Sequence, residues 1–144
     1  MNKDTVELEN ELLKTEQLED FFDTNQDNFR DFDLSKYLNW LIEEKNLSKA
    51  DVIRQSELDY IYAYHIFSGR KKKPARNKII SLALAMNLSL AETQRLLYYA
   101  EVEKLYVRSE WDSVIIFALE KNLSVKQTND LLNEFSFSNL VGDF

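Results

Sequence analysis

Six basic side chains stand within nine residues near the middle of the sequence. They are Arg70, Lys71, Lys72, Lys73, Arg76 and Lys78. Clustered cations of this kind can pair with the phosphates of a nucleic acid and release its condensed counter-ions, which favours binding at low salt. Lys49 and Arg54 lie upstream and add to the charge. The same run is also compatible with an ordinary solvated turn, so its interpretation depends on the elements around it.

Few residues in this chain support other kinds of chemistry. It has no cysteine, which excludes disulfides, thiolate metal ligands and cysteine nucleophiles, and its single histidine is His65. No glycine-rich phosphate-binding loop occurs. The adjacent acids Glu43 and Glu44 point apart on a helix, so they do not converge on one site. We therefore expect no catalytic residues, no metal site and no cofactor, and we do not expect an enzyme.

The net charge of −7 is distributed unevenly along the chain. Residues 1–33 carry three basic and eleven acidic side chains, which is a balance of −8. Residues 34–109 carry thirteen basic and eight acidic side chains, a balance of +5, and residues 110–144 carry two and six, a balance of −4. The basic run therefore lies in an electropositive middle between two acidic ends.

The composition favours an all-α protein. Apolar residues make up 44% of the sequence, but only two glycines and one proline are present for tight turns. Apolar periodicity and capping residues predict one helix from about 6 to 22, a polar linker, and six helices at 34–45, 48–54, 59–68, 74–86, 89–100 and 124–135. A further helix is predicted to start at Ser109 or Asp112 and to include Leu119. We divide the chain into an acidic arm at 1–33, a central domain at 34–105, and a C-terminal extension at 106–144 that packs on the core or dimerises.

The tripeptide Asn-Leu-Ser occurs three times, at 46–48, 87–89 and 122–124. Each copy ends one predicted helix and supplies a serine cap for the next. After the second and third copies the similarity continues, because LSLAETQRLLYYAEVEKL and LSVKQTNDLLNEFSFSNL share residues in register. Duplication of a helical hairpin explains this match, and so does the common use of serine caps after leucine.

The stretch 34–105 resembles the helix-turn-helix domain of the Cro and phage-repressor type, the Xre family. The residues that carry the resemblance are Leu47, Ser48, Val52, Ser56, Leu58, Asp59, Ala63, Ile66, Gly69, Pro74, Ile79 to Met86, Leu88 and Ser89. The spacing from the cap Asp59 to Gly69 is its specific part. With its continuation to about residue 140, the chain resembles a bacterial subgroup of these regulators that has an added C-terminal helical extension. It departs from the usual pattern in having four loop residues at 70–73 instead of three, and in having Phe67 where an acidic residue is common.

The resemblance implies a five-helix repressor-like core with an acidic N-terminal helix or arm and two extra C-terminal helices. It also implies that the helix 59–67 enters the major groove of DNA and that the loop 70–78 contacts phosphates. The DNA-binding residues would be Lys49, Tyr60, Ile61, Tyr64, His65, Arg70, Lys71, Lys72, Lys73 and Arg76. Tyrosine hydroxyls can bond to bases or phosphates, and Ile61 can contact a thymine methyl group. The predicted reading helix has no Arg, Asn or Gln for a bidentate base contact, so modest sequence specificity is expected, and its aromatic residues are also compatible with core packing.

The leading prediction is a sequence-specific DNA-binding transcriptional regulator, of the repressor kind, that acts on double-stranded DNA as a homodimer. The alternative is a protein-interaction module that keeps the helix-turn-helix scaffold but has lost DNA reading, which the overall acidity favours. The N-terminal residues lack the pattern of a secretory signal, and no apolar run reaches the roughly 18 residues that span a bilayer. We therefore expect a cytoplasmic protein of bacterial or phage type without a membrane partner.

The acidic arm at 1–33 has three possible roles. It is a solvated arm, a helix that binds a protein partner, or a DNA mimic that covers the basic loop electrostatically. The contrast between its balance of −8 and the +5 of residues 34–109 motivates the third role.

Overall fold

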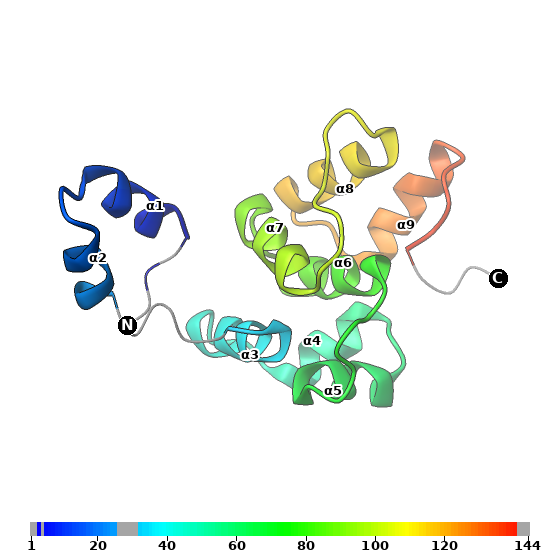
Figure 1. The fold of residues 1–144 in the computed structure, drawn as a ribbon. Helices are drawn as coiled ribbons and strands as arrows, with labels where there is room; N and C mark the ends of the chain where they lie inside the picture. Colours follow the sequence, from blue (N-terminus) through cyan, green and yellow to red (C-terminus); the bar gives the residue numbers. More distant parts are fainter. Residues whose placement is uncertain (1–2, 4, 26–31, 141–144) are drawn as a thin grey trace. The chain divides into compact units, whose positions relative to one another are not determined.

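The computed structural model describes residues 3, 5–25 and 32–140. Within these residues the chain forms nine α-helices and no strand, which confirms the all-α fold (Figure 1). The chain divides into two compact units, residues 1–32 and 33–144. The first contains α1 (Thr5–Lys14) and α2 (Leu18–Thr24). The second contains α3 (Leu34–Glu44), α4 (Lys49–Ser56), α5 (Tyr60–Ser68), α6 (Arg76–Ala85), α7 (Leu90–Tyr99), α8 (Glu110–Glu120) and α9 (Val125–Glu134).

The first unit is a pair of short helices, so the prediction of one helix from 6 to 22 is wrong. After α1 the Thr15 hydroxyl donates to the carbonyl of Glu11 at 2.8 Å, and the Thr15 N–H turns back to Leu12. A threonine that bonds to the backbone in this way competes with helix continuation. Gln17 then takes extended backbone angles, φ −122° and ψ 121°, before α2 begins. The apolar pattern on either side gave no signal for this break.

Polar side chains join the two helices of the first unit. Lys3 Nζ donates to Glu11 at 2.8 Å and to Asn25 Oδ1 at 2.7 Å, and the Asn25 side chain also donates to Glu11. The hydrogen bonds from Lys3 and Asn25 lower the pKa of the Glu11 carboxyl. Phe21 is the buried apolar side chain of this unit within the described residues. The unit is therefore held by a polar network around a very small apolar core.

In the second unit, a three-residue turn at 57–59 joins α4 to α5. Ser48 caps α4 by accepting from the N–H of Asp51, and Asp59 caps α5 by accepting from the N–H of Tyr62 at 3.0 Å. The buried Ser56 hydroxyl donates to Ile53 and accepts from the Leu58 N–H, so the turn has its polar groups satisfied. These local bonds set the direction in which α5 leaves α4.

α5 is anchored at its far end by α3. Ser35 Oγ and Asn39 Nδ2 both donate to the carbonyl of Phe67, the latter at 2.8 Å. Gly69 ends the helix with φ 88°, a left-handed angle that suits glycine, and lies beside Ser35. The side chains of Ala63, Ile66 and Phe67 are buried, so the opposite side of α5 faces outward.

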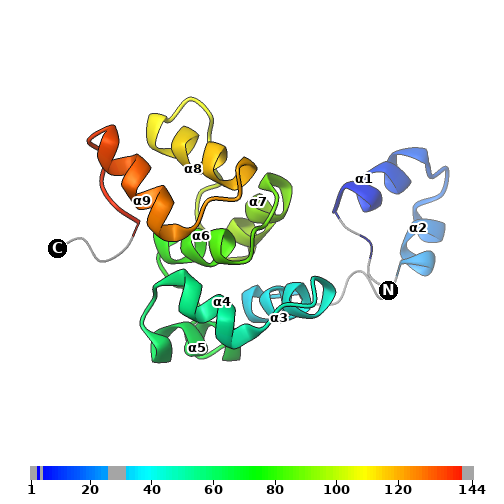
Figure 2. The same cartoon turned by 180° about the vertical axis from the view of Figure 1, so that it is seen from behind.

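α6 is the central helix of the second unit. Seven of its ten residues, 79–85, are buried in succession. Amphipathic helices bury one face, whereas a helix that is buried all round must be covered on several sides. α4, α7 and α9 pack against it, and Figure 2 shows it among them. Because α9 packs on α6 and α8 on α7, the extension at 106–144 belongs to the same compact unit as residues 34–105.

The three Asn-Leu-Ser junctions have the same backbone geometry. Asn46, Asn87 and Asn122 take φ angles of 54°, 53° and 54°. After each asparagine, the leucine N–H bonds back five residues at 2.9 to 3.1 Å. This is the Schellman ending of a helix, in which a left-handed residue lets the last carbonyls find donors. Each turn thus ends one helix and places a serine at the start of the next.

The last two hairpins repeat each other with an offset of thirty-five residues. Gln94 bonds to the backbone of Leu105, and Asn129, its counterpart, accepts from the N–H of Leu140 at 2.8 Å. The Arg76 side chain donates to the carbonyl of Glu103 at 2.8 Å, and its counterpart Trp111 donates to the carbonyl of Ser138 at 2.9 Å. Long-range bonds in the same register do not follow from serine capping alone. They favour duplication of the α6–α7 hairpin as the origin of α8–α9.

Candidate nucleic-acid interface

The outward face of α5 is aromatic and apolar. Tyr60 and Ile61 are 61% and 63% exposed, whereas Tyr64 and His65 are half-buried. The Tyr60 and Tyr64 rings lie with centroids 4.7 Å apart at 55°. A hydrogen bond with Tyr60 is the main cause that raises the pKa of the Tyr64 hydroxyl. The structure thus brings together the four α5 residues that the sequence predicted, as one accessible surface.

Two lysines are held against α5 by a tyrosine ring. Lys78 Nζ lies 5.2 Å from the centroid of the Tyr62 ring, and Lys71 Nζ lies 5.9 Å from it. The Lys71 N–H also bonds to the carbonyl of His65 at 2.9 Å, which ties the start of the loop to the end of the helix. Cation–π contacts of this kind orient an ammonium group without neutralising it. Both charges therefore stay available to an anion.

The cations around the C-terminal end of α5 differ in the contacts that they make within the protein. Lys73 Nζ lies 3.7 Å from a carboxylate oxygen of Glu101, but both side chains are exposed, so the pair is weak. Arg70, Lys71 and Lys72 are exposed and have no ion pair within the described part of the chain. Lys49 Nζ stands 5.2 Å from the centroid of the Phe67 ring. These groups form a set of accessible cations at the C-terminal side of α5.

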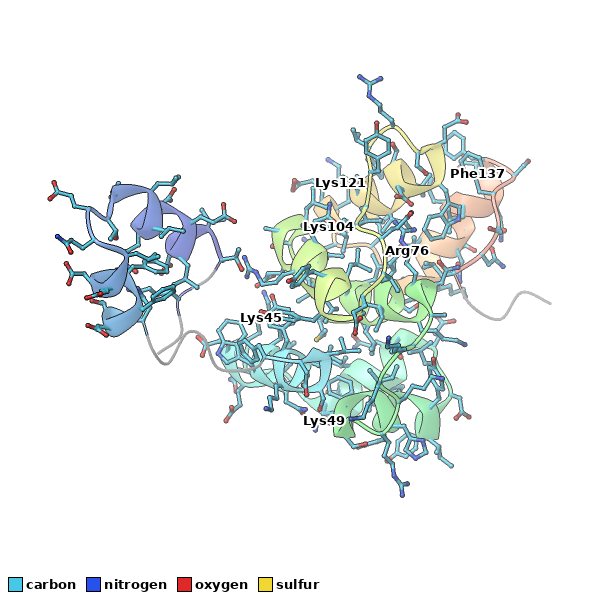
Figure 3. All side chains as sticks on the ribbon, in the orientation of Figure 1. Lys45, Lys49, Arg76, Lys104, Lys121 and Phe137 are labelled. Carbon is cyan, nitrogen blue, oxygen red and sulfur yellow. The ribbon has the colours of Figure 1, made fainter. Side chains whose placement is uncertain are left out.

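Arg76 is engaged elsewhere, although the sequence grouped it with the loop cations. Its guanidinium donates to both carboxylate oxygens of Asp112, at 2.8 and 3.1 Å, and to the carbonyls of Glu103 and Lys104. Four of its five N–H donors are therefore in use inside the protein. Figure 3 shows Lys49 beside α4 and α5 and Arg76 well apart from it, toward α8. The structure does not bring Arg76 into the α5 surface.

The other end of α5 is acidic. Glu57 and Asp59 are exposed in the turn before the helix, and Arg54 is paired with Asp51 at 2.8 Å. The N-terminal end of α5 therefore offers little attraction to a phosphate, whereas its C-terminal end carries the accessible lysines. A bound polyanion would be held mainly from the C-terminal side.

The contact of Lys78 with the Tyr62 ring was not predicted from the sequence. The sequence counted it in the basic run, but only the fold shows that it shares the Tyr62 ring with Lys71. Tyr62 is half-buried rather than part of the core. A tyrosine sixteen positions before a lysine gives no signal of contact, because helix α6 begins between them and its direction is set by tertiary packing.

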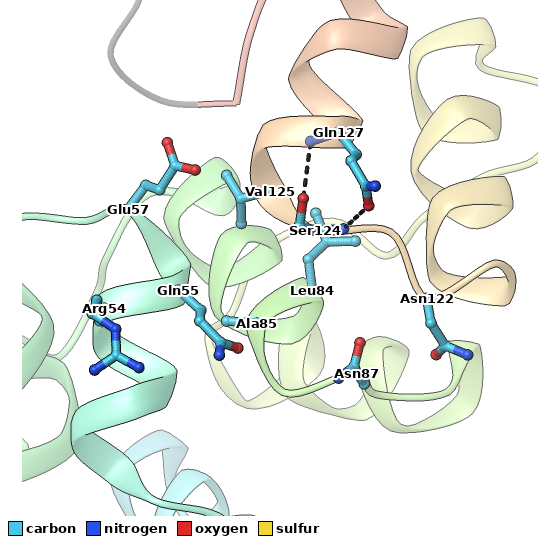
Figure 4. Close-up of a pocket in the computed structure, with 10 residues that line it drawn as sticks. All are labelled: Arg54, Gln55, Glu57, Leu84, Ala85, Asn87, Asn122, Ser124, Val125 and Gln127. Atoms are coloured by element: carbon cyan, nitrogen blue, oxygen red, sulfur yellow. Dashed lines mark hydrogen bonds between the residues drawn. The ribbon is translucent and has the colours of Figure 1, made fainter.

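Other features of the second unit provide little for catalysis. A pocket of about 450 Å³ lies between α4, α6 and the start of α9, with a polar rim that includes Gln55, Asn87, Asn122 and Gln127 (Figure 4). Ser124 and Gln127 bond to each other's backbone there as a capping box, so their polar groups are occupied. Among the residues that the structure describes, no group of three or more His, Cys, Asp or Glu side chains is arranged to hold a metal ion.

No protein-family model, curated protein or solved structure matches this chain. Over the described residues, no helix is long and apolar enough to cross a membrane.

Proposed function

We propose that this chain is a sequence-specific DNA-binding transcriptional regulator, of the repressor kind, in the cytoplasm. The observation that carries the proposal is the single surface formed by the exposed face of α5 and the lysines held at its C-terminal end. In this proposal α3 to α7 are the repressor-like helix-turn-helix core, α8 and α9 are the extension, and residues 1–33 are the acidic arm. The sequence resemblance to the Xre family supports the same assignment.

In the proposed complex α5 lies in the major groove of double-stranded DNA. Tyr60, Ile61 and Tyr64 face the base edges, and His65 reaches a phosphate or a base from the same side. Phosphates are neutralised by Lys49, Arg70, Lys71, Lys72, Lys73 and Lys78, whereas Arg76 supports the fold through Asp112. Six such contacts would lower the affinity roughly 10³-fold between 50 and 200 mM salt.

Charge reversal in the loop tests this function. Replacement of Lys71, Lys72 and Lys73 by Glu in the full chain should abolish retention of DNA fragments at about 50 mM salt. A matched control reverses Lys104, Lys121 and Lys126, three exposed lysines of the same unit outside the α5 surface. Because both variants change the net charge equally, only a loss confined to the first supports a DNA site in the loop. Failure of the unaltered chain to retain any fragment at this salt would refute the function.

The proposed regulator acts as a homodimer, because two copies can read two half-sites about one helical turn, roughly 34 Å, apart. Exposed aromatic side chains on α8 and directly after α9, Phe117 and Phe135, make the extension the preferred dimer surface. Sedimentation of the full chain with and without replacement of both residues by Ser tests this point. If the unaltered chain sediments as a monomer at all concentrations, the proposed homodimer is excluded.

The second candidate function is a protein-interaction module on the same scaffold. The first unit favours it, because this acidic helix pair exposes Val6, Leu12, Leu13, Leu18 and Phe22. Apolar side chains among acids on a small unit fit a partner with a basic, amphipathic surface. If this function is correct, the reversal of Lys71, Lys72 and Lys73 leaves the biological activity intact, whereas replacement of Leu13 and Phe22 by Ser removes it.

A further inference from the structure

The N-terminal half of α5 offers an aromatic and apolar ridge, made of Tyr60, Ile61 and Tyr64. Tyr60 and Ile61 are neighbours on α5 and have more than half of their surface exposed, so together they present apolar surface that a ligand can contact. At the base edges of the major groove, the apolar group is the C5-methyl of thymine. The chemistry of the ridge and that of the methyl group are therefore complementary.

The ridge is ordered before any ligand arrives. The Tyr60 and Tyr64 rings pack against each other, with their centroids 4.7 Å apart and their planes at 55°. Asp59 holds the first turn of α5 by accepting from the Tyr62 N–H. Side chains that are already held lose little conformational entropy on binding, so their apolar contacts contribute more to affinity.

The ridge has no side chain that can recognise guanine or adenine through a pair of hydrogen bonds. Bidentate contacts to a purine need Arg, Lys, Asn or Gln, and α5 from Tyr60 to Ser68 contains none of them. The nearest cations are placed elsewhere, because Lys71 and Lys78 lie over the Tyr62 ring and Arg76 is bonded to Asp112. Apolar contact is therefore the main means of base discrimination left to the ridge.

We propose that the ridge of Tyr60, Ile61 and Tyr64 reads thymine methyl groups, so that the preferred DNA sites carry A·T pairs, with the thymine facing α5, at the contacted positions. This inference rests on the proposed DNA binding and adds the class of sequence that is bound. Ile61 is the central specificity residue of the ridge, because its side chain is purely aliphatic and exposed.

The preference for thymine is tested by selecting, from a pool of random sequences, the duplexes that the full chain binds. The expected motif has thymine at the positions that face α5. Thymine at these positions is then replaced by uracil, which removes only the methyl group. The affinity of the unaltered chain should fall about four-fold for each contacted methyl, since burial of one such group favours binding to that extent.

The substitution Ile61→Ala tests whether the ridge causes the difference in affinity between thymine and uracil sites. This variant should bind the thymine site more weakly and should lose most of the difference between thymine and uracil. Val107→Ala is the matched control, because Val107 is 68% exposed in the same unit but lies in the loop between α7 and α8. The control should keep the full thymine preference. Tyr60→Phe and Tyr64→Phe should also keep it, because the rings and not the hydroxyls contact the methyl group.

Three outcomes separate the inference from the function on which it rests. Equal affinity of the unaltered chain for thymine and uracil sites, with DNA binding intact, would overturn the inference alone. A selected motif in which G·C pairs face α5 would do the same. If no duplex is retained even at about 50 mM salt, where phosphate contacts are strongest, the inference and the proposed function both fail.

Discussion

At the residue scale, the role of a charged side chain depends on its partners. Arg76 and Lys78 are two positions apart in the sequence, yet the guanidinium of Arg76 is bonded to a carboxylate and two carbonyls, whereas Lys78 stands over a ring. The ion pair of Arg76 with Asp112 is largely buried, with 24% and 8% of the side chains exposed. The Asp112 carboxylate also accepts from the Tyr106 N–H at 2.9 Å, so it organises the loop between α7 and α8.

Removal of the Asp112 charge should destabilise the fold. Asp112→Asn leaves the Arg76 guanidinium without its carboxylate, and breaking a pair of this kind costs about 2 to 3 kcal/mol of the free energy of unfolding. Chemical denaturation of the full chain measures the loss. Asp130→Asn, on the exposed side of α9, is the control and should change stability by less than about 0.5 kcal/mol. Equal effects of the two substitutions would contradict a structural role for the pair.

We expect the buried Tyr37 hydroxyl to make the fold less stable at alkaline pH. Its ring is buried against Trp40 and Tyr99, and burial raises the pKa of its hydroxyl above the ordinary value of 10.0. As the pH rises, the unfolded chain therefore loses the Tyr37 proton before the folded chain does. The contribution of the protonated hydroxyl to the free energy of unfolding is fully present below about pH 10 and is lost as the pH rises through the higher pKa of the folded state.

The substitution Tyr37→Phe keeps the ring but removes the proton. The free energy of unfolding of this variant should fall less steeply above pH 10 than that of the unaltered chain, as measured by denaturation at a series of pH values. Tyr106→Phe, at an exposed position in the same unit, is the control. Identical alkaline slopes for the unaltered chain and the Tyr37 variant would show that Tyr37 does not titrate between the two states.

At the element scale, left-handed asparagines determine where the helices stop. Asn122 has φ 54°, an angle that costs a residue with a Cβ roughly 1 kcal/mol, and asparagine tolerates it better than most residues. The same turn recurs at Asn46 and Asn87 with the same angle to within a degree. Three pairs of consecutive helices are therefore joined by one kind of turn.

Substitutions at Asn122 should separate backbone strain from side-chain contacts. Asn122→Ala should destabilise the fold by about 1 kcal/mol, whereas Asn122→Gly should be neutral or slightly stabilising, because glycine adopts positive φ freely. Thermal or chemical denaturation of both variants gives the comparison. Asn133→Ala, within α9, is the control and should be neutral or slightly stabilising. If Asn122→Gly destabilised the fold as much as Asn122→Ala, side-chain bonds would matter more than the turn geometry.

At the scale of the whole molecule, charge is segregated between the two units. Residues 33–144 carry fifteen basic and fifteen acidic side chains, so the excess negative charge of the chain belongs to residues 1–32. Fields between exposed charges act over about 10 Å at 0.1 M salt and further at lower salt. If the second unit binds DNA as proposed, the acidic first unit is expected to weaken that binding mainly when the salt is low.

Neutralisation of the first unit tests this expectation in the full chain. Replacement of Glu16, Glu19, Asp20 and Asp23 by their amides, all at exposed positions, should raise the affinity for DNA at about 50 mM salt and have little effect at about 200 mM. The control neutralises four exposed acids of the extension, Glu110, Glu120, Asp130 and Glu134. A larger gain in the first variant than in the control would indicate that the arm covers the DNA site. No gain in either variant would contradict electrostatic inhibition by the acidic residues.

The all-α class and most helix ends followed from local patterns in the sequence. Asp59, Ser48, Ser89 and Ser124 cap helices where the sequence predicted caps, and Gly69 ends α5 as expected. Caps and helical turns depend on hydrogen bonds between residues three to five positions apart, which a sequence displays directly. The residues of the α5 surface were named through the resemblance to the Xre family, and the helix agrees with them because its period places them away from the buried Ala63 and Ile66.

Tertiary structure alone decided how these residues are shared between folding and binding. Arg76 reaches Asp112 across thirty-six positions, and Lys78 joins Lys71 at one tyrosine ring, because α6 is covered on several sides and directs both side chains. Contacts between residues far apart in the chain depend on how whole helices pack, and local propensity does not specify that packing. The sequence by itself therefore determined which residues form the helices and which charges are present, and the packing around α6 decided which of those charges remain accessible to a ligand.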